Sequence, residues 1–113
     1  MRLPNKIAIV TGAGSGFGEG IAKRFSQEGA SVVVNDINIA GGERVAQEIA
    51  AAGGRALFCA GDVSSDRDVA ALVRFTLDRF GDLDIVVNNA GTTHKNQPML
   101  DVAEEEFDRI YRV

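Results

Sequence analysis

The residues whose spacing points most directly to chemistry are the glycines of Thr-Gly-Ala-Gly-Ser-Gly-Phe-Gly, residues 11–18. They follow the apolar run at residues 6–10, which predicts a buried strand. Glycines allow the backbone to turn sharply where Cβ atoms would interfere. Phe17, Ile21 and Phe25 then recur at helical spacing. A strand, a glycine turn and a helix start, in this order, direct free N–H groups toward an anion such as a nucleotide pyrophosphate.

A carboxylate ends the second apolar run. Asp36 follows Gly18 by eighteen positions, close to the spacing of about 20 residues at which dinucleotide-binding folds place an acid on the ribose hydroxyls. Its charge would repel a 2′-phosphate, and neither Asn35 nor Ile37 is a cation. NAD is therefore preferred over NADP. A capping or turn aspartate is the alternative interpretation.

Two further polar segments follow predicted strands. Gly61-Asp62-Val63 comes after the third apolar run, and Asn88-Asn89-Ala90-Gly91 comes after the fourth. Ligands of open parallel sheets bind at the carboxyl ends of the strands, where small residues let a base or a ribose approach the backbone. Asparagine side chains can instead tie neighbouring strand ends together. Each segment by itself is also consistent with an ordinary loop.

These segments need regular elements to position them. The pattern predicts strands over residues 6–10, 31–36, 56–60 and 83–88, and helices over residues 17–28 and 39–52. Apolar side chains recur at helical spacing from Val69 to Phe80 and predict a further helix. Ser64 or Ser65 can cap its start, and Gly81 ends it. A last helix begins at Asp101. Strands that alternate with helices predict an α/β fold, a Rossmann-type doubly wound parallel sheet with about four strands here.

Composition narrows the function classes. The chain has 113 residues and a net charge of -4, which argues against a nucleic-acid surface but not against one bound dinucleotide. Its apolar runs are short, and we expect no membrane span, no signal peptide and a cytoplasmic location. Cys59 is the only cysteine, so no disulfide framework or zinc cluster is expected. We predict no metal site, and Cys59 as a small buried hydrophobe.

Other nucleotide-binding turns differ from this one in spacing. A P-loop requires Gly-Lys followed by Ser or Thr, whereas Gly18 is followed by Glu19. The glycines at 12, 14 and 16 also fit the turn of S-adenosylmethionine-dependent methyltransferases. Those enzymes usually carry an acid just before the glycines, where this chain has Val10-Thr11.

Taken together, the glycine segment, Asp36, Asp62-Val63 and Asn88-Asn89-Ala90-Gly91 resemble the short-chain dehydrogenase/reductase family throughout the chain. The resemblance implies an NAD-binding domain of an oxidoreductase. It implies the cofactor-binding residues Gly12, Ser15, Gly16, Phe17, Gly18, Asp36, Asp62, Val63, Asn89 and Gly91. The glycines would border the pyrophosphate, with Ser15 and Phe17 nearby. Asp36 would hold the adenosine ribose, Asp62 and Val63 would meet the adenine, and Asn89 and Gly91 would lie along the cofactor.

The catalytic residues of this family are not expected within these residues. The family uses a tyrosine, a lysine four residues later, a serine and an asparagine, all after the cofactor-binding half. Tyr111 is the only tyrosine and shares a predicted helix with Phe107 and Ile110, which favours packing. His94, the only histidine, lies in a polar segment that predicts a solvated loop, although contact with a substrate is an alternative. We therefore assign no catalytic residue.

A dinucleotide-binding fold has two halves, and the pattern accounts for the first half and one more strand. We therefore expect residues 1–113 to be one NAD(P)-binding domain, truncated after its fourth strand and the start of the next helix. The full-length protein would transfer a hydride between NAD(H) and a small-molecule secondary alcohol or ketone, as a homo-oligomer. The alternative is a nucleotide-binding module without catalysis.

Overall fold

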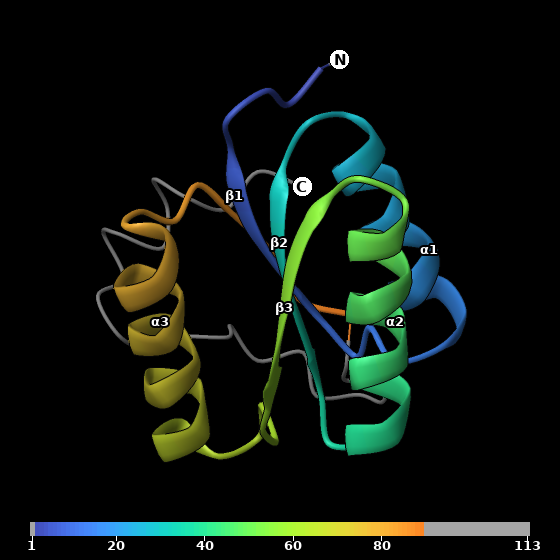
Figure 1. Cartoon of the computed structure of the whole chain (residues 1–113). Coiled ribbons are helices and arrows are strands. Elements are labelled where there is room, and N and C mark those ends of the chain that lie inside the picture. The colour runs from blue at the N-terminus through green and yellow to red at the C-terminus, as the bar shows by residue number, and fades with distance from the viewer. Residues whose placement is uncertain (1, 90–113) are drawn as a thin grey trace.

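The computed structural model describes residues 2–89 of the chain. These residues fold into a parallel β-sheet with helices on both faces (Figure 1). Its elements are β1 (Ile7–Thr11), α1 (Gly16–Gln27), β2 (Ser31–Asp36), α2 (Ile39–Ala51), β3 (Arg55–Ala60), α3 (Asp66–Phe80) and β4 (Ile85–Val87). The strand order is β3-β2-β1-β4, and every pairing is parallel. In Figure 1, α3 lies on one side of the sheet and α1 and α2 lie on the other. The predicted fold class is confirmed.

The predicted bounds of β2 match the observed ones, and those of the other strands and of α1 and α2 differ by at most two residues. The largest difference is at β4, which was expected over residues 83–88 and spans Ile85–Val87. Leu83 is buried in the core, but it precedes the strand. The backbone N–H of Asp84 donates to the carbonyl of Ile7 at 2.8 Å. The predicted helix from Asp101 lies outside the described residues.

Alternate residues of each strand pack into two separate cores. Ala8, Val32 and Val34 belong to the core under α1 and α2, where Val45 and Ile49 of α2 also lie. On the other face, Ile9, Val33 and Val86 pack with Val69 and Leu72 of α3. Both faces are covered, so the strands can be continuous Val and Ile runs without polar alternation.

Two of the helices begin with side-chain caps. Asn38 accepts a hydrogen bond from the N–H of Gly41 at the start of α2, at 3.0 Å. Ser65 accepts one from the N–H of Asp68 at the start of α3, at 3.2 Å. Of the two candidate caps at α3, the structure thus selects Ser65. Gly81 ends α3 with φ of 84°, a conformation that disfavours other residues.

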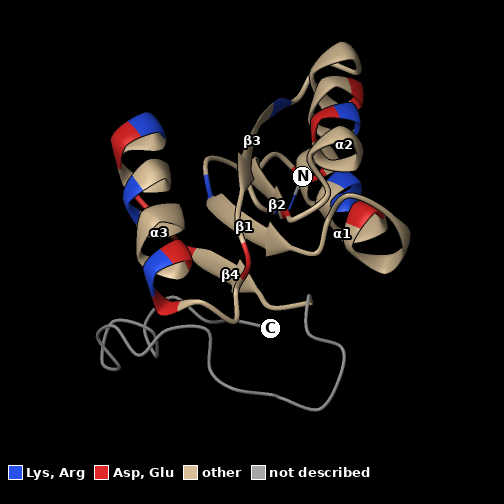
Figure 2. Cartoon of the chain, turned by 90° about the horizontal axis from the view of Figure 1, so that it is seen from below, with Lys and Arg blue, Asp and Glu red and all other residues tan. Residues whose placement is uncertain are grey.

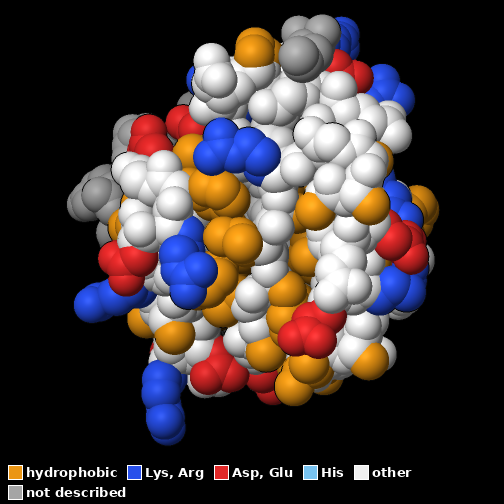
Figure 3. All heavy atoms as spheres, in the orientation of Figure 1, with side chains coloured by type: hydrophobic (Ala, Val, Ile, Leu, Met, Phe, Trp, Pro, Cys, Tyr) orange, Lys and Arg blue, Asp and Glu red, His pale blue; other side chains and the backbone are white. Residues whose placement is uncertain are grey.

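The outer strand β3 is less protected than the central strands. Charged residues lie mostly on the helices (Figure 2), whereas hydrophobic side chains are visible along β3 between α2 and α3 (Figure 3). The guanidinium of Arg55 lies 5.6 Å from the centre of the Phe80 ring. Cys59 is consequently only half-buried, not fully buried as expected, and desolvation raises the pKa of its thiol.

The start of β1 is bound to the segment before β4 by a side chain. The carboxylate of Asp84 accepts a hydrogen bond from the backbone N–H of Ile7 at 2.9 Å. The N–H of Asp84 donates in return to the carbonyl of Ile7. These two bonds place β4 beside β1, so that the end of β4 lies next to the glycine turn that follows β1.

We expect Asp84→Ala to lower the free energy of unfolding by about 1–2 kcal/mol, because the part-buried N–H of Ile7 loses its acceptor. Urea unfolding followed by circular dichroism measures this change. Asp78→Ala is the matched control, since Asp78 is exposed on α3 and surface substitutions change stability by about 0.5 kcal/mol or less. Equal effects of the two substitutions would contradict the role of Asp84.

Candidate functional site

The glycine turn connects the end of β1 to an α1 N-terminus that has no side-chain cap. Ser15 is the N-cap residue of α1, and its hydroxyl makes no hydrogen bond to the first turn. Gly16 has φ of 60° and open space where a Cβ would stand. A Cβ on Gly18 would overlap the carbonyl oxygen of Gly12. The positive φ of Gly16 and the close approach at Gly18 explain why glycines stand here, and no side chain caps the first N–H groups of α1.

The carboxylate of Asp36 joins this turn to the end of β2. One oxygen accepts from the N–H of Gly14 at 2.8 Å, and the other accepts from the N–H of Asn38 at 3.0 Å. Asp36 therefore links the glycine turn to the segment that starts α2. This is the turn-forming role that was left open as the alternative, and it places the carboxylate beside the turn.

The end of β4 is bound to the same turn. The N–H of Asn89 donates to the hydroxyl of Thr11 at 2.8 Å, and the Asn89 amide donates to the carbonyl of Gly12 at 3.3 Å. The Thr11 hydroxyl also lies 3.3 Å from the side-chain oxygen of Asn88. Asn89 thus ties neighbouring strand ends together, as one of the two readings of this segment expects.

The end of β3 is held by a residue that the sequence did not single out. Asn35 is 1% exposed, and its amide donates to the carbonyls of Cys59 and Gly61 at 3.1 and 3.4 Å. Asp62 is exposed, and two hydrogen bonds from Ser64 lower the pKa of its carboxyl. Its side chain therefore forms the turn that leads into α3.

Val63 continues that turn and is partly buried, packed against the core cluster under α3. The predicted residues from Gly12 to Asn89 thus lie at the carboxyl ends of four neighbouring strands. Gly91, His94 and Tyr111 lie outside the described residues.

Ion pairs connect α1 to α2 next to the turn. Glu19 of α1 binds Arg44 at 2.9 Å and Lys23 at 2.7 Å. Glu48 of α2 binds the same two cations, at 3.1 and 2.6 Å. The Arg44 guanidinium also donates to the carbonyl of Gly14 at 3.3 Å. Hydrogen bonds from Arg44 and then Lys23 lower the pKa of Glu19 to about 2.

Two exposed hydrophobic side chains flank the turn. Phe17, at the start of α1, is 83% exposed, and Ile37, directly after Asp36, is 69% exposed. Large apolar side chains that are exposed beside polar groups indicate a binding surface. Here they stand in the sequence next to the uncapped N-terminus of α1 and the carboxylate of Asp36, a combination suited to a ligand with both apolar and charged parts.

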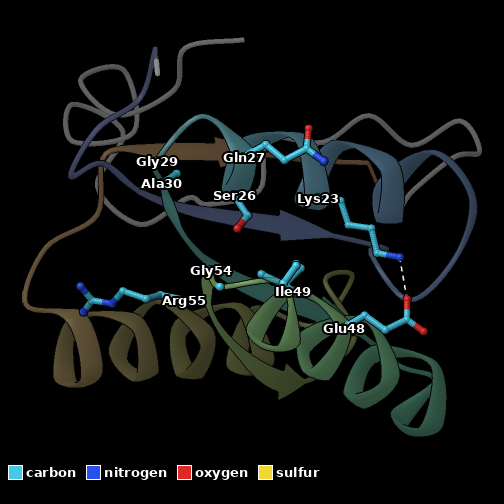
Figure 4. Close-up of a pocket in the computed structure, with 11 residues that line it drawn as sticks. Lys23, Ser26, Gln27, Gly29, Ala30, Glu48, Ile49, Gly54 and Arg55 are labelled. Carbon is cyan, nitrogen blue, oxygen red and sulfur yellow. Dashed lines mark hydrogen bonds and ion pairs between the residues drawn. The ribbon is translucent and has the colours of Figure 1, made fainter.

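A separate cavity of about 520 Å³ lies at the opposite end of the helices (Figure 4). It is lined by Ser26, Gly29, Ile49, Gly54 and Arg55, among others. These residues lie at the starts of β2 and β3 and at the carboxyl-terminal ends of α1 and α2. Helix carboxyl ends carry partial negative charge and disfavour phosphate. None of residues 11–18 lines the cavity, which is therefore distinct from the glycine turn.

Among residues 2–89, no group of three or more His, Cys, Asp or Glu side chains is placed to hold a metal ion. In the same part of the chain, no helix has the length and apolar character needed to cross a membrane.

Comparison with known proteins identifies the family. The family model described as short chain dehydrogenase matches residues 6–113. The chain belongs to the short-chain dehydrogenase family. This agrees with the resemblance carried by the glycine turn and the strand-end segments.

Two relatives illustrate the similarity. The chain is 57% identical over 113 residues to 4-formylbenzenesulfonate dehydrogenase TsaC1/TsaC2 of Comamonas testosteroni, covering 100% of this chain and 45% of that protein. It is 47% identical to 7α-hydroxysteroid dehydrogenase of Escherichia coli K12, covering 100% of this chain and 44% of that protein. The chain thus spans less than half the length of these relatives.

The fold is shared with solved structures. A 7α-hydroxysteroid dehydrogenase complexed with NADH and 7-oxo glycochenodeoxycholic acid matches with a TM-score of 0.80 and 43% identity, over 96% of this chain and 42% of that one. A short-chain dehydrogenase/reductase from Burkholderia phymatum in complex with NAD matches with a TM-score of 0.73 and 31% identity, over 76% of this chain and 31% of that one.

The structure adds residues that the sequence did not indicate as part of the site. In the sequence, Asn35 is notable only as an uncharged neighbour of Asp36, and its buried amide bonds depend on the pairing of β2 with β3. No motif in the sequence includes Arg44. Its spacing from Glu48 suggests only an ordinary pair on one helix, whereas its contacts with Glu19 and Gly14 join segments distant in the sequence. Thr11 was inside the motif, but its bonds to the end of β4 are tertiary.

The ion pairs of Glu19 give a testable pH dependence. Because its folded-state pKa of about 2 lies below the ordinary value of 4.5, the pairs stabilise the folded chain fully above about pH 4.5 and the stabilisation is lost as the pH falls through about 2. We expect the difference in melting temperature between the wild type and Glu19→Gln to be constant above about pH 4.5 and to shrink as the pH falls from there toward about 2. Thermal unfolding at several pH values measures it.

Glu43→Gln is the control for this series, because Glu43 is exposed on α2 and forms none of the ion pairs found in the described residues. Its melting temperature should follow that of the wild type across the range. A Glu19→Gln difference that persists unchanged near pH 2 would contradict the ion-pair interpretation.

Proposed function

We propose that this chain is the NAD-binding part of a short-chain oxidoreductase that transfers a hydride between NAD(H) and a small-molecule secondary alcohol or ketone. The observation that carries the proposal is the uncapped N-terminus of α1, which follows the glycine turn and lies beside the carboxylate of Asp36. The solved relatives complexed with NADH and with NAD support the same cofactor class.

The pyrophosphate would bind at the start of α1. Free N–H groups at a helix start and the positive end of the helix dipole both attract phosphate oxygens. Gly12, Gly16 and Gly18 would border the pyrophosphate. A side chain at these positions would strain the turn or overlap its backbone. Exposed Ser15 and Phe17 would contact the cofactor from the first turn of α1.

The adenosine ribose would bind to Asp36. A carboxylate has about four acceptor positions, and the N–H groups of Gly14 and Asn38 occupy two of them. The remaining positions can accept both ribose hydroxyls. The same negative charge repels a 2′-phosphate, which supports NAD rather than NADP.

The remaining cofactor contacts would come from the ends of β3 and β4. Val63 and the turn at Asp62 would border the adenine, and the amide of Asn89 would lie along the cofactor while it holds the turn through Gly12. Gly91 stays a prediction from the sequence.

When bound, the nicotinamide accepts or donates the hydride. The residues argued above bind and orient the cofactor, and we assign no proton-transfer residue among them. We propose residues 1–113 as one NAD(P)-binding domain, truncated relative to the full-length protein. The cytoplasmic location and the homo-oligomeric state of that protein also stay predictions from the sequence.

We expect Asp36→Asn to lower the preference for NAD over NADP, measured as the ratio of their dissociation constants, by about tenfold, equivalent to ~1.4 kcal/mol. Asparagine keeps one acceptor, for the N–H of Gly14, but loses the acceptor for the N–H of Asn38 and removes the charge that repels the 2′-phosphate. Titration calorimetry with both dinucleotides gives the ratio, which does not depend on the folded fraction. Asp78→Asn is the matched control on α3. An unchanged ratio in Asp36→Asn would overturn the ribose assignment.

Titration with NADH and with S-adenosylmethionine tests the cofactor class. We expect NADH to bind and to raise the melting temperature, because it stabilises the folded state by mass action, and S-adenosylmethionine to do neither. Turnover of NAD with secondary alcohols on the same sample separates an enzyme from a non-catalytic module. Binding without turnover over a panel of alcohols would favour the module, and no NADH binding would refute the proposal.

A further inference from the structure

We propose that Arg44 is a positioning residue for the glycine turn, holding the carbonyl of Gly14 so that the turn keeps its nucleotide-binding shape. This inference rests on the proposed dinucleotide binding. It assigns a role to a side chain outside the glycine motif and outside the ends of the strands.

Gly14 is held through both of its backbone polar groups. Its N–H donates to Asp36 at 2.8 Å, and its carbonyl accepts from Arg44 at 3.3 Å. The first bond joins the turn to β2 and the second joins it to α2. With both bonds formed, the peptide groups on either side of Gly14 cannot rotate without breaking one of them.

The N-terminus of α2 approaches the turn closely enough for this second bond. A Cβ on Gly41 would lie 2.9 Å from the carbonyl oxygen of Gly14, and a Cβ on Gly14 would lie 3.1 Å from the N–H nitrogen of Gly42. Arg44 then reaches the same carbonyl from less than one helical turn further along α2. The absence of side chains on Gly14 and Gly41 therefore allows α2 to approach the turn closely enough for the Arg44 contact to form.

Two carboxylates hold the guanidinium in place. One nitrogen of Arg44 lies 2.9 Å from Glu19, and the other lies 3.1 Å from Glu48. The planar fork of arginine has enough N–H donors to bind both carboxylates and a carbonyl together. Glu19 is on α1 and Glu48 on α2, so the position of the guanidinium depends on the packing of both helices.

Lys23 provides a matched comparison within the same network. Its ammonium binds Glu19 at 2.7 Å and Glu48 at 2.6 Å, the same two carboxylates that Arg44 binds. No hydrogen bond from Lys23 to the glycine turn is found in the described residues. Lys23 therefore shares the α1–α2 ion pairs with Arg44 but not the contact with Gly14.

The experiment compares Arg44→Met, Arg44→Lys and Lys23→Met with the wild type. Dissociation constants for NADH are measured by titration calorimetry well below the melting temperature of each variant. We expect Arg44→Met to weaken NADH binding about fivefold, the factor that corresponds to ~1 kcal/mol. Lys23→Met should bind like the wild type, although both methionine variants lose ion pairs and melt at lower temperature.

Arg44→Lys serves as a partial rescue. A lysine ammonium can still pair with Glu19 or Glu48, but it lacks the fork that reaches the carbonyl of Gly14 as well. We therefore expect its melting temperature to recover while its affinity for NADH stays below that of the wild type.

The outcomes separate this inference from the proposed function. Equal loss of NADH affinity in Arg44→Met and Lys23→Met, or no loss in either, would refute the positioning role while dinucleotide binding by the wild type stands. Full recovery of affinity in Arg44→Lys would also refute it, because charge alone would then suffice. A wild type that does not bind NADH overturns the proposed function itself.

Discussion

The hydrogen bond between the carboxylate of Asp36 and the N–H of Gly14 is the contact on which the site geometry depends. At 2.8 Å it joins the end of β2 to the middle of the glycine turn. The other carboxylate oxygen binds Asn38, the residue that caps α2. One side chain thereby sets the positions of the turn and of the start of α2. Its remaining acceptor capacity is available for the ribose hydroxyls of the proposed cofactor.

The three described helices differ in the capping of their N-termini, and the uncapped one, α1, is the helix that follows the glycine turn. Asn38 and Ser65 satisfy N–H groups at the starts of α2 and α3, whereas Ser15 makes no such bond at α1. An uncapped helix start costs stability in an isolated domain. It occurs here where the glycine turn brings the backbone into the open, which is consistent with an anion completing these hydrogen bonds.

A second set of contacts supports the turn from outside. The bonds from Asn89 and Arg44 to the carbonyls of Gly12 and Gly14 come from the end of β4 and from α2. Both bonds act on the backbone of the turn and not on a ligand, so both residues affect the shape that the turn presents. The shape of the turn therefore depends on its surroundings as well as on its own glycines.

The sequence by itself determined the α/β class, the parallel sheet, the element order and the location of the glycine turn, because these follow from local apolar periodicity and from glycine spacing. It also indicated Asp36 and the polar strand ends as candidates. Only the tertiary structure decided which atoms they bind: Asp36 to Gly14 and Asn38, Asn35 to the end of β3, and Arg44 across two helices. Such contacts join residues that are distant in the sequence. Asp36 and Gly14 are 22 positions apart, Asn35 and Cys59 are 24 apart, and Arg44 and Gly14 are 30 apart. Their geometry depends on strand register and helix packing, which no local pattern specifies.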